Sequence, residues 1–336
     1  MRNHLRRLSV GLPVYNGEKF IRESIDSILA QTFTDFELII CDNASTDKTE
    51  EICRAYAAKD ERIRYYRNEN NIGCARNFNR VFQLSTGEYF KWIAYDDLHA
   101  PDFLEKCIEI LVQDSSVVLC HSHVYHIDEQ GKFLQNYDIK FKTDSPKPQE
   151  RFQELLTKHY CYQIYGVIRA DAIRKTPPLS GCAAADAIFL LRLSLLGRFY
   201  EIPEYLFFPR THPQQSLSMF LPNYLLTTHN NHQKSLRNLP DFYGYAVWFD
   251  SSNQSKILLP HWRILGEILL SIWQANLNWQ VKLSCLFSVP KRLYGTEYLL
   301  LKDLLLVART YWVNWQIRQK ARGRRQKEGK SFHHHA

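Results

Sequence analysis

The first hundred residues alternate short apolar runs with stretches of helical periodicity, an order that few architectures accept. Four runs have the length and composition of buried strands, at 8–14, 36–41, 63–66 and 89–94. The stretches with helical periodicity follow them, at 18–31, 48–58, 75–84 and 101–112. Strands that alternate with helices at this spacing form right-handed βαβ units around a mostly parallel sheet. The sequence therefore predicts an α/β fold.

The alternation weakens after residue 115. A hairpin-type turn at 128–131 and a polar segment with two prolines at 142–149 interrupt it. Helices are expected at 152–159 and 184–196, and a last strand at 200–208. Farther along, helical stretches are predicted near 259–275, 278–288 and 296–317. We expect an α/β domain at 1–215 with halves at 1–115 and 116–215, a helical region at 216–317 and a basic tail at 318–336.

Positive charge is concentrated near the C-terminal end of the chain. The net charge is +8, and seven Lys and Arg residues lie between Arg318 and Lys330 against one acid, Glu328. The rest of the chain is nearly neutral. A nucleic-acid-binding surface spreads positive charge over a fold, so the sequence argues against a nucleic-acid partner.

Eight cysteines lie singly along the chain without a CxxC pair, most of them inside apolar runs, as at Cys41 and Cys120. This pattern indicates free buried thiols in a reducing compartment, and neither disulfides nor a zinc site. Residues 1–15 contain too short an apolar run for a signal peptide, and no run reaches the ~18 apolar residues of a membrane-spanning helix. We therefore expect a cytoplasmic protein.

Polar residues gather where the predicted strands end. Asp42 follows the second strand, 71–77 follow the third, and Asp96 and Asp97 follow the fourth. Ligands of open parallel sheets bind beyond these carboxyl ends. Adjacent carboxylates repel each other unless a cation neutralises them, and Mg²⁺ or Mn²⁺ prefers such ligands and bridges to phosphates. The alternative is that Asp97 only caps the helix that opens near Pro101.

Two common nucleotide-binding signatures are absent from the sequence. It has neither a GxxxxGK[ST] loop nor a GxGxxG fingerprint after the first strand. This argues against P-loop nucleoside triphosphatases and dinucleotide-dependent dehydrogenases. A diphosphate would instead be held by a metal ion and by arginine side chains.

Five separated motifs resemble those of glycosyltransferase family 2. They are PVYNGE at 13–18, SILAQT at 27–32, DNASTDKT at 42–49, NIGCARN at 71–77, and TGEY at 86–89 followed by the Asp96–Asp97 pair. Each motif is modest alone, but their order and spacing agree, and the resemblance covers residues 7–215. It implies a GT-A fold, which is a Rossmann-like, mostly parallel central sheet flanked by helices, here with a mainly helical C-terminal extension.

The resemblance assigns roles to residues of the first half. Pro13, Tyr15 and Glu18 would line the nucleoside pocket, and Asp42 would accept a hydrogen bond from the base. Asn71 would contact the nucleotide-sugar.

Further along the same half, the resemblance places Arg76 near the diphosphate, lets Asp96 contact ribose or sugar, and lets Asp97 coordinate Mg²⁺ or Mn²⁺. The D-x-D-D motif of the family reads Ala94-Tyr95-Asp96-Asp97 in this chain, so its first acid is absent.

In the second half, Asp186 lies at the start of the helix predicted at 184–196, among apolar residues. By resemblance it is the general base that deprotonates the acceptor hydroxyl. The alternative is a carboxylate that the helix dipole favours. The segment Arg210-Thr211-His212 resembles the Arg-x-His loop that closes over donor phosphates. Arg210 would neutralise the departing diphosphate, and His212 would complete the metal shell or hydrogen-bond a phosphate. The alternative for His212 is a structural histidine.

Three other histidines invite a metal interpretation. His121 and His123 share one face of a strand, and we interpret them as residues of a solvent-facing edge strand, because no acid or cysteine can be assigned to complete a site. His99 follows Asp97 closely, but we rank it below His212 because it is expected to begin the next helix.

The C-terminal helix allows two interpretations. Residues 297–317 are rich in Leu, Trp and Tyr and are followed by the basic tail. This composition is typical of a helix in a membrane interface, which would place 296–330 on the inner face of the cell membrane. Equally, the helix could pack on the catalytic domain and end in a solvated tail.

The sequence therefore favours an inverting, metal-dependent glycosyltransferase. Its donor would be a UDP-, GDP- or dTDP-sugar, and its acceptor a hydroxyl of a glycan or lipid-linked glycan in cell-surface polysaccharide assembly. One alternative is a catalytically silent sugar-nucleotide or glycan-binding protein with the same fold. A nucleotidyltransferase is disfavoured, because the triphosphate loop expected near the first strand is missing.

Overall fold

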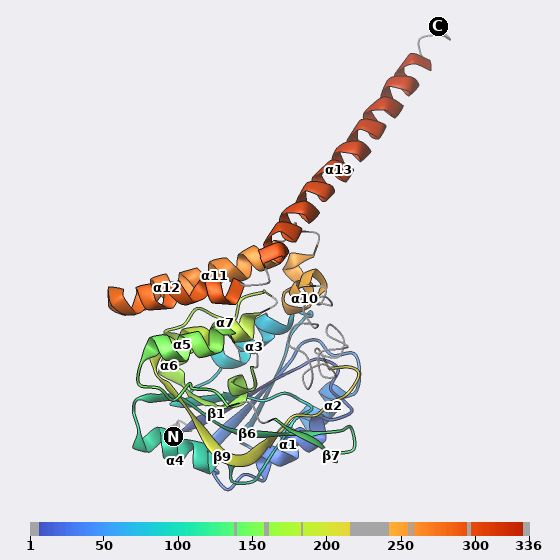
Figure 1. Cartoon of the computed structure of the whole chain (residues 1–336). Helices are drawn as coiled ribbons and strands as arrows, with labels where there is room; N and C mark the ends of the chain where they lie inside the picture. The colour runs from blue at the N-terminus through green and yellow to red at the C-terminus, as the bar shows by residue number, and fades with distance from the viewer. Residues whose placement is uncertain are drawn as a thin grey trace.

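The computed structural model describes residues 7–137, 140–157, 161–182, 184–215, 242–254, 256, 259–293 and 297–331, and Figure 1 shows their arrangement. The strands are β1 (Leu8–Val14), β2 (Phe36–Asp42), β3 (Ile63–Arg67), β4 (Tyr89–Trp92), β5 (Leu98–His99), β6 (Val117–Ile127), β7 (Phe133–Tyr137), β8 (Val167–Arg169) and β9 (Arg198–Phe208). The helices of the α/β part are α1 (Ile21–Leu29), α2 (Thr49–Ala57), α3 (Cys74–Gln83), α4 (Phe103–Gln113), α5 (Pro148–Thr157), η1 (Tyr162–Tyr165), α6 (Ala170–Arg174) and α7 (Ala185–Leu196). They are followed by α10 (Phe242–Phe249), η3 (Ser251–Asn253), α11 (Pro260–Gln274), α12 (Trp279–Leu293) and α13 (Glu297–Ser331).

One mixed sheet forms the centre of the molecule, with the strand order β3-β2-β1-β4-β8-β6-β9-β5 and with β7 paired to β6. The first four strands are parallel, which confirms the predicted α/β fold. Beyond β4 the pairing changes, because β8 is antiparallel to both β4 and β6, whereas β9 is parallel to β6. The carboxyl ends of β1 to β4 therefore meet along one edge, as the sequence predicted.

Helices cover both faces of the sheet. Alternate residues of β1, beginning at Leu8, face a core that they share with α1, α2 and α4. The other face packs against α3, α5 and α7. On that face Gly11 allows a close approach of α3, because an added Cβ would lie 2.7 Å from Phe90 Cζ and 3.0 Å from Val81 Cγ2. Strand and helix residues with these periodicities thus build a three-layer α/β part.

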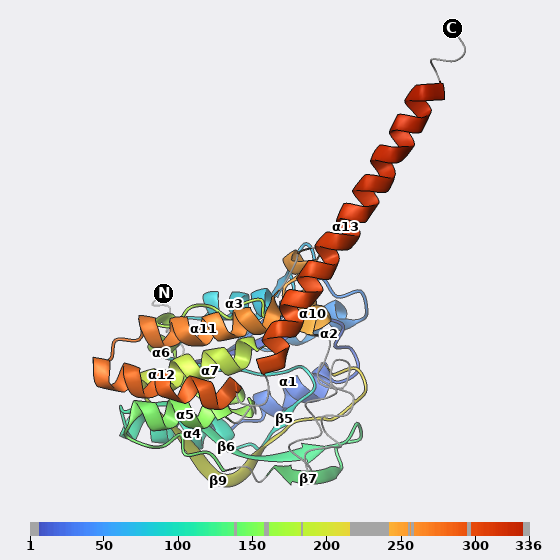
Figure 2. The same cartoon turned by 45° about the horizontal axis from the view of Figure 1, so that its top comes forward.

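The helices α11 and α12 form an outer layer on the side of α5 and α7 (Figure 1). Their inner residues, such as Ile268, Ile272 and Cys285, belong to the same core as α7. An ion pair between Arg192 Nη2 and Glu267 Oε2, at 2.6 Å, ties α7 to α11. From this layer α13 extends away from the rest of the molecule (Figure 2). Within the described residues, no helix has the length and apolar content that crossing a membrane requires.

Helix α13 includes most of the predicted basic tail and continues to Ser331, because Arg, Lys, Gln and Glu propagate a helix well. One sequence interpretation is corrected. The strand that carries His121 and His123 is not a solvent-facing edge strand. It is β6, which lies between β8 and β9 in the sheet, and His121 is buried. Residues 332–336 lie outside the described part.

Candidate functional site

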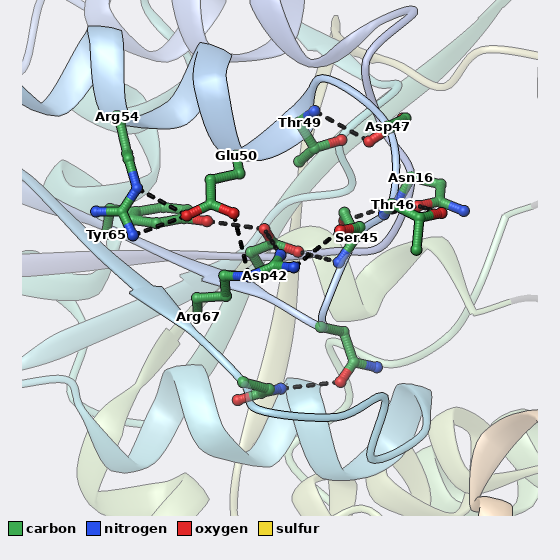
Figure 3. A network of polar contacts seen from close by, with 12 residues as sticks. Asn16, Asp42, Ser45, Thr46, Asp47, Thr49, Glu50, Arg54, Tyr65 and Arg67 are labelled. Atoms are coloured by element: carbon green, nitrogen blue, oxygen red, sulfur yellow. Dashed lines mark hydrogen bonds and ion pairs between the residues drawn. The ribbon is translucent and has the colours of Figure 1, made fainter.

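The loops that follow β1 and β2 are hydrogen-bonded to each other (Figure 3). The Asn16 amide donates to Ser45 Oγ at 2.9 Å, and the Thr46 amide donates to Asn16 Oδ1 at 2.8 Å. Glu18 Oε2 accepts from the Lys48 amide at 2.9 Å. Asn16 has a φ of 53°, a left-handed conformation that Asn tolerates. These bonds fix the backbone where the resemblance expected a nucleoside pocket, with Glu18 as a loop-bridging residue.

Pro13 and Tyr15, which were also predicted to line that pocket, lie at the end of β1. Pro13 is buried inside the strand and pairs with Cys41 of β2. Tyr15 follows the strand, and its side chain is exposed. The structure therefore leaves Tyr15 available to a ligand, whereas Pro13 shapes the strand that carries it.

Asp42 is the buried centre of a polar network at the end of β2 (Figure 3). Its exposed fraction is 0%, its Oδ1 accepts from the Ser45 amide at 2.8 Å, and its Oδ2 accepts from Tyr65 Oη at 2.7 Å and Arg67 Nη1 at 2.8 Å. Burial, and then Asp42, raise the pKa of Tyr65. A nucleobase could bond to Asp42 only by exchanging one of these partners or by contacting Arg67, whose side chain is partly exposed.

Sequence reasoning missed Tyr65 and Arg67. They share one face of β3, and the parallel register places Arg67 opposite Asp42. Tyr65 and Arg67 are two residues apart, so their polar groups could be expected on one side of a strand. Only the pairing of β2 with β3 shows which carboxylate they contact.

A chain of asparagine side chains orders the loop after β3. Asn71 Oδ1 accepts from Asn43 Nδ2 and from the Gly73 amide, both at 2.9 Å. Asn43 Oδ1 in turn accepts from Asn68 Nδ2 at 2.8 Å. Asn71, predicted as a ligand contact, therefore holds the loop before α3, the helix whose first turn carries Arg76.

Residues 242–254 pack against this loop. Arg76, which is exposed, forms an ion pair with Asp250, with Nε 3.3 Å from Oδ1. Gly73 has a φ of 88°, and an added Cβ there would lie 2.8 Å from the Phe249 carbonyl oxygen. In the half at 116–215, the Gly181 carbonyl accepts a hydrogen bond from Asn253 Nδ2 at 2.8 Å. The segment therefore contacts loops of both halves, and Arg76 reaches a diphosphate only by leaving Asp250.

Asp96 and Asp97 lie side by side after β4 and are 8% and 5% exposed. Asp97 Oδ1 accepts from the Arg210 amide at 3.0 Å, and His212 Nε2 lies 2.7 Å from Asp96 Oδ2. Burial, and then the neighbouring Asp96 charge, raise the pKa of Asp97 well above its ordinary value. The structure thus brings Asp96 and Asp97 together with Arg210 and His212, whereas Arg76, which the resemblance also placed near the diphosphate, pairs with Asp250.

The Arg210 side chain is directed into the protein. Its guanidinium is fully buried, with Nε donating to the Asp96 carbonyl at 3.0 Å and Nη1 donating to the Glu129 carbonyl at 2.8 Å. Its Nη2 forms an ion pair with Glu23 Oε2 at 2.7 Å, and the guanidinium lies 4.7 Å from the centre of the Phe20 ring. Arg210 therefore braces the acidic pair, in the sense that its guanidinium holds the backbone at Asp96 in place. A contact with a diphosphate would require the guanidinium to leave these partners.

A buried lysine, also missed by sequence reasoning, lies near the acidic pair. Lys91 Nζ donates to the Tyr165 carbonyl and lies 4.4 Å from the centre of the Phe103 ring. Burial lowers the pKa of Lys91 to about 7, and the charge of Asp97 acts in the opposite direction. The one visible signal was a single lysine inside the apolar strand YFKWIA. Lys91 therefore joins β4 to η1.

His99 is not a metal ligand in this arrangement. It lies in the short strand β5, and not at the start of a helix as predicted, because α4 begins only at Phe103. Its ring stacks on Phe207 at 5.0 Å, and neither ring nitrogen has a hydrogen-bond partner. Burial lowers the pKa of His99 well below its ordinary value.

His121 and His123 do have an acid nearby, contrary to the sequence interpretation. Glu201 of β9 lies 3.8 Å from His121 Nδ1 and 3.8 Å from His123 Nε2. Burial lowers the pKa of His121 to about 4. Among the described residues, these three side chains are not part of any group of three or more His, Cys, Asp or Glu that could hold a metal ion.

Asp186 begins α7, with its Oδ1 accepting from the Ala187 amide at 2.8 Å. Burial raises the pKa of this carboxyl, and a hydrogen bond from the Cys161 thiol acts in the opposite direction. Burial raises the pKa of the Tyr165 hydroxyl, and the charges of Asp97, Asp96 and Asp186 act in the same direction.

The acidic pair suits a hard divalent cation. Two buried carboxylates that repel each other gain from added positive charge, and carboxylate oxygens are the ligands that Mg²⁺ and Mn²⁺ prefer. Within the described ranges, no group of three or more His, Cys, Asp or Glu side chains is arranged to hold a metal ion. A cation here would take its remaining ligands from a bound substrate, as Mg²⁺ commonly does.

Known proteins with similar sequences are glycosyltransferases. An uncharacterized glycosyltransferase of Methanocaldococcus jannaschii is 37% identical over 158 residues, which cover 45% of this chain and 53% of the relative. Chondroitin synthase of Escherichia coli is 33% identical over 129 residues, covering 38% of this chain and 19% of the synthase. This chain spans about half, or less, of the length of the relatives that it matches.

Solved structures share the fold. TarS of S. aureus, residues 1–349 in complex with UDP-GlcNAc, has a TM-score of 0.52 at 15% identity, covering 87% of this chain and 92% of that one. The mannosyltransferase PcManGT of Pyrobaculum calidifontis, in complex with GDP-Man and Mn²⁺, has a TM-score of 0.50 at 16% identity, covering 86% and 76%. The family model described as glycosyl transferase family 2 matches residues 9–176. The chain therefore belongs to glycosyl transferase family 2 and has the GT-A fold.

Proposed function

We propose that the protein transfers a sugar from a nucleoside-diphosphate-sugar to a hydroxyl acceptor with inversion at the anomeric carbon. One observation carries the proposal: Asp42 and the buried Asp96–Asp97 pair follow β2 and β4, two parallel strands on either side of β1, so they lie at the same edge of the sheet. The complexes of TarS with UDP-GlcNAc and of PcManGT with GDP-Man support a nucleotide-sugar donor. UDP-, GDP- and dTDP-sugars all suit a pocket of this type.

The donor diphosphate would be bound with Mg²⁺ or Mn²⁺. Asp97 would hold the ion, with His212 next to it, and Asp96 would keep His212 in place. The ion would supply positive charge that stabilises the diphosphate as it leaves. The Mn²⁺ in the PcManGT complex supports this assignment.

Asp186 would act as the general base. It would take the proton of the acceptor hydroxyl as that oxygen attacks the anomeric carbon from the side opposite the diphosphate, so a single displacement inverts the configuration. Burial raises the pKa of Asp186, which makes it a stronger base than an exposed aspartate. The Cys161 thiol would orient the carboxylate without removing its charge.

The acceptor would be a glycan or a lipid-linked glycan in cell-surface polysaccharide assembly, a proposal that the similarity to chondroitin synthase supports. The protein would work in the cytoplasm, where eight free thiols stay reduced. It would bind peripherally to the inner face of the cell membrane through 296–330. Trp312 and Trp315 of α13 are exposed there, next to the basic stretch.

The test is sugar transfer and donor hydrolysis by Asp97→Ala and Asp186→Asn. We expect both variants to lose transfer by at least about a hundredfold, as removal of a general acid or base commonly does. Asp171→Asn is the matched control, because this carboxylate is exposed on α6 and pairs only with Lys175 in the structure. Wild-type rates in both site variants would refute the assignment. Metal-dependent UDP binding without turnover on any acceptor would favour the silent binding protein.

A further inference from the structure

The α11–α12 hairpin carries a stripe of exposed apolar side chains. In α12, Trp279, Leu283 and Phe287 recur every four residues and are 62%, 46% and 77% exposed. On the opposite side of this helix, Cys285 and Val289 are buried in the core shared with α7. Four-residue spacing places the three exposed side chains on one face, so α12 is apolar on both its inner and its outer side.

The stripe continues onto α11. Trp262, Leu269 and Trp273 are exposed, and Trp273 reaches 66%. The rings of Trp273 and Trp279 lie 5.9 Å apart and join the two helices at the tip of the hairpin. Figure 2 shows α11 and α12 side by side on the outside of the molecule. The exposed residues therefore form one continuous face, which we call the hairpin face: Trp262, Leu269, Trp273, Trp279, Leu283 and Phe287.

The α11–α12 hairpin has an excess of positive charge. Lys282 Nζ lies 5.9 Å and 5.7 Å from the ring centres of Trp273 and Trp279. The sequence of α12 contains Lys282, Lys291 and Arg292 and no acid. From 259 to 293 there are four Lys and Arg against one acid, Glu267, which is paired with Arg192.

We propose that the hairpin face binds the surface of an anionic lipid bilayer. Tryptophan rings are favoured at the level of the lipid headgroups, and lysines beside them attract anionic lipids. A second copy of the chain is a poorer occupant. A symmetric contact would bring the same positive surface of two molecules together, and like charges repel. This proposal does not depend on sugar transfer. It concerns the exposed side of α11 and α12, which adjoins α13 at Trp262, whose Nε1 donates to the Leu300 carbonyl.

Vesicle sedimentation of the full chain tests the proposal, with phosphatidylglycerol–phosphatidylcholine vesicles against phosphatidylcholine alone. The variant is Trp273→Ser/Trp279→Ser/Phe287→Ser, whose side chains are exposed and whose loss should leave folding intact. The matched control is Phe133→Ser/Leu134→Ser, exposed on β7 by 53% and 48%. A third variant, Trp312→Ser/Trp315→Ser, tests α13 in the same way. Thermal unfolding checks that each variant is folded.

We expect the wild type and the control to bind the anionic vesicles, and the hairpin variant to lose about tenfold or more in partition coefficient. Weaker binding to phosphatidylcholine alone would support the charge argument. If the α13 variant binds vesicles as the wild type does, the contact is on the hairpin face. That result would refute only the membrane contact proposed for 296–330. Two results would overturn the inference: equal vesicle binding by the hairpin variant and the wild type, or no vesicle binding with a concentration-dependent dimer that the hairpin variant abolishes.

Discussion

Replacement of Arg210 by methionine separates two roles for this residue. If Arg210 neutralises the departing diphosphate, as the resemblance suggests, Arg210→Met weakens donor use and leaves stability nearly unchanged. If it braces the acidic pair, as its contacts indicate, the same change destabilises the fold. Methionine keeps the apolar stem of the side chain as far as the position of Nε, and it removes every bond of the guanidinium together with its contact with the Phe20 ring.

The size of the effect can be worked from those bonds. The Asp96 and Glu129 carbonyls would each lose a charged donor, at 3.0 Å and 2.8 Å, and an unsatisfied buried carbonyl costs about 1–2 kcal/mol. Glu23 is 56% exposed on its side chain and would return to water, so its ion pair contributes at most about 1 kcal/mol. The sum is roughly 2–5 kcal/mol. For a chain of this length that corresponds to a fall in Tm of about 3–7 °C.

Calorimetry and urea titration measure this loss. The control is Arg54→Met, because Arg54 is exposed on α2 and its i,i+4 pair with Glu50 contributes less than about 0.5 kcal/mol. The Arg210 backbone amide, which donates to Asp97, is present in every variant, so that bond cancels in the comparison. A Tm equal to that of the wild type, with a raised KM for the donor, would refute the bracing role.

Three further predictions follow from the site and the core. Burial raises the pKa of Asp186, and a base must be ionised to act, so kcat/KM should fall as the pH drops through a pKa above that of an ordinary carboxyl. A pH–rate profile that is flat down to pH 4 would contradict this. EDTA should remove transfer and Mn²⁺ or Mg²⁺ should restore it, so transfer that persists in EDTA argues against a metal at Asp97. Gly11→Ala should cost about 1–3 kcal/mol in urea unfolding, since its Cβ would meet Phe90 and Val81; unchanged stability would mean that α3 moves freely.

The first half of the fold was predictable because its signals are local. Each parallel strand is a short apolar run and each helix has one apolar side, so element positions follow from periodicity. The polar residues at strand ends were predictable for the same reason, because the edge of a parallel sheet gathers them. The sequence alone therefore placed Asp42 and the Asp96–Asp97 pair beyond the carboxyl ends of two parallel strands, and in the structure these strands, β2 and β4, lie on either side of β1.

The errors arose where the answer depends on pairing between distant segments. Tyr65 and Arg67 became partners of Asp42 only through the register of β2 and β3. The strand with His121 looked like an edge strand because polar residues alternate along it, yet β8 and β9 pair with both its sides. Arg210 looked available to a ligand until the structure showed which carbonyls take its donors. Periodicity carries none of this information.

The contacts of Asp250 and Asn253 decide where the catalytic unit can be cut. Their side chains reach Arg76 in the first turn of α3 and the turn at Gly181, five residues before Asp186. The family match ends at 176, and the α/β pattern ends at 215. A fragment that stops at either position would lose the contacts of Asp250 with Arg76 and of Asn253 with Gly181. Any shortened version meant for kinetics or crystallisation should therefore retain the chain at least through 254.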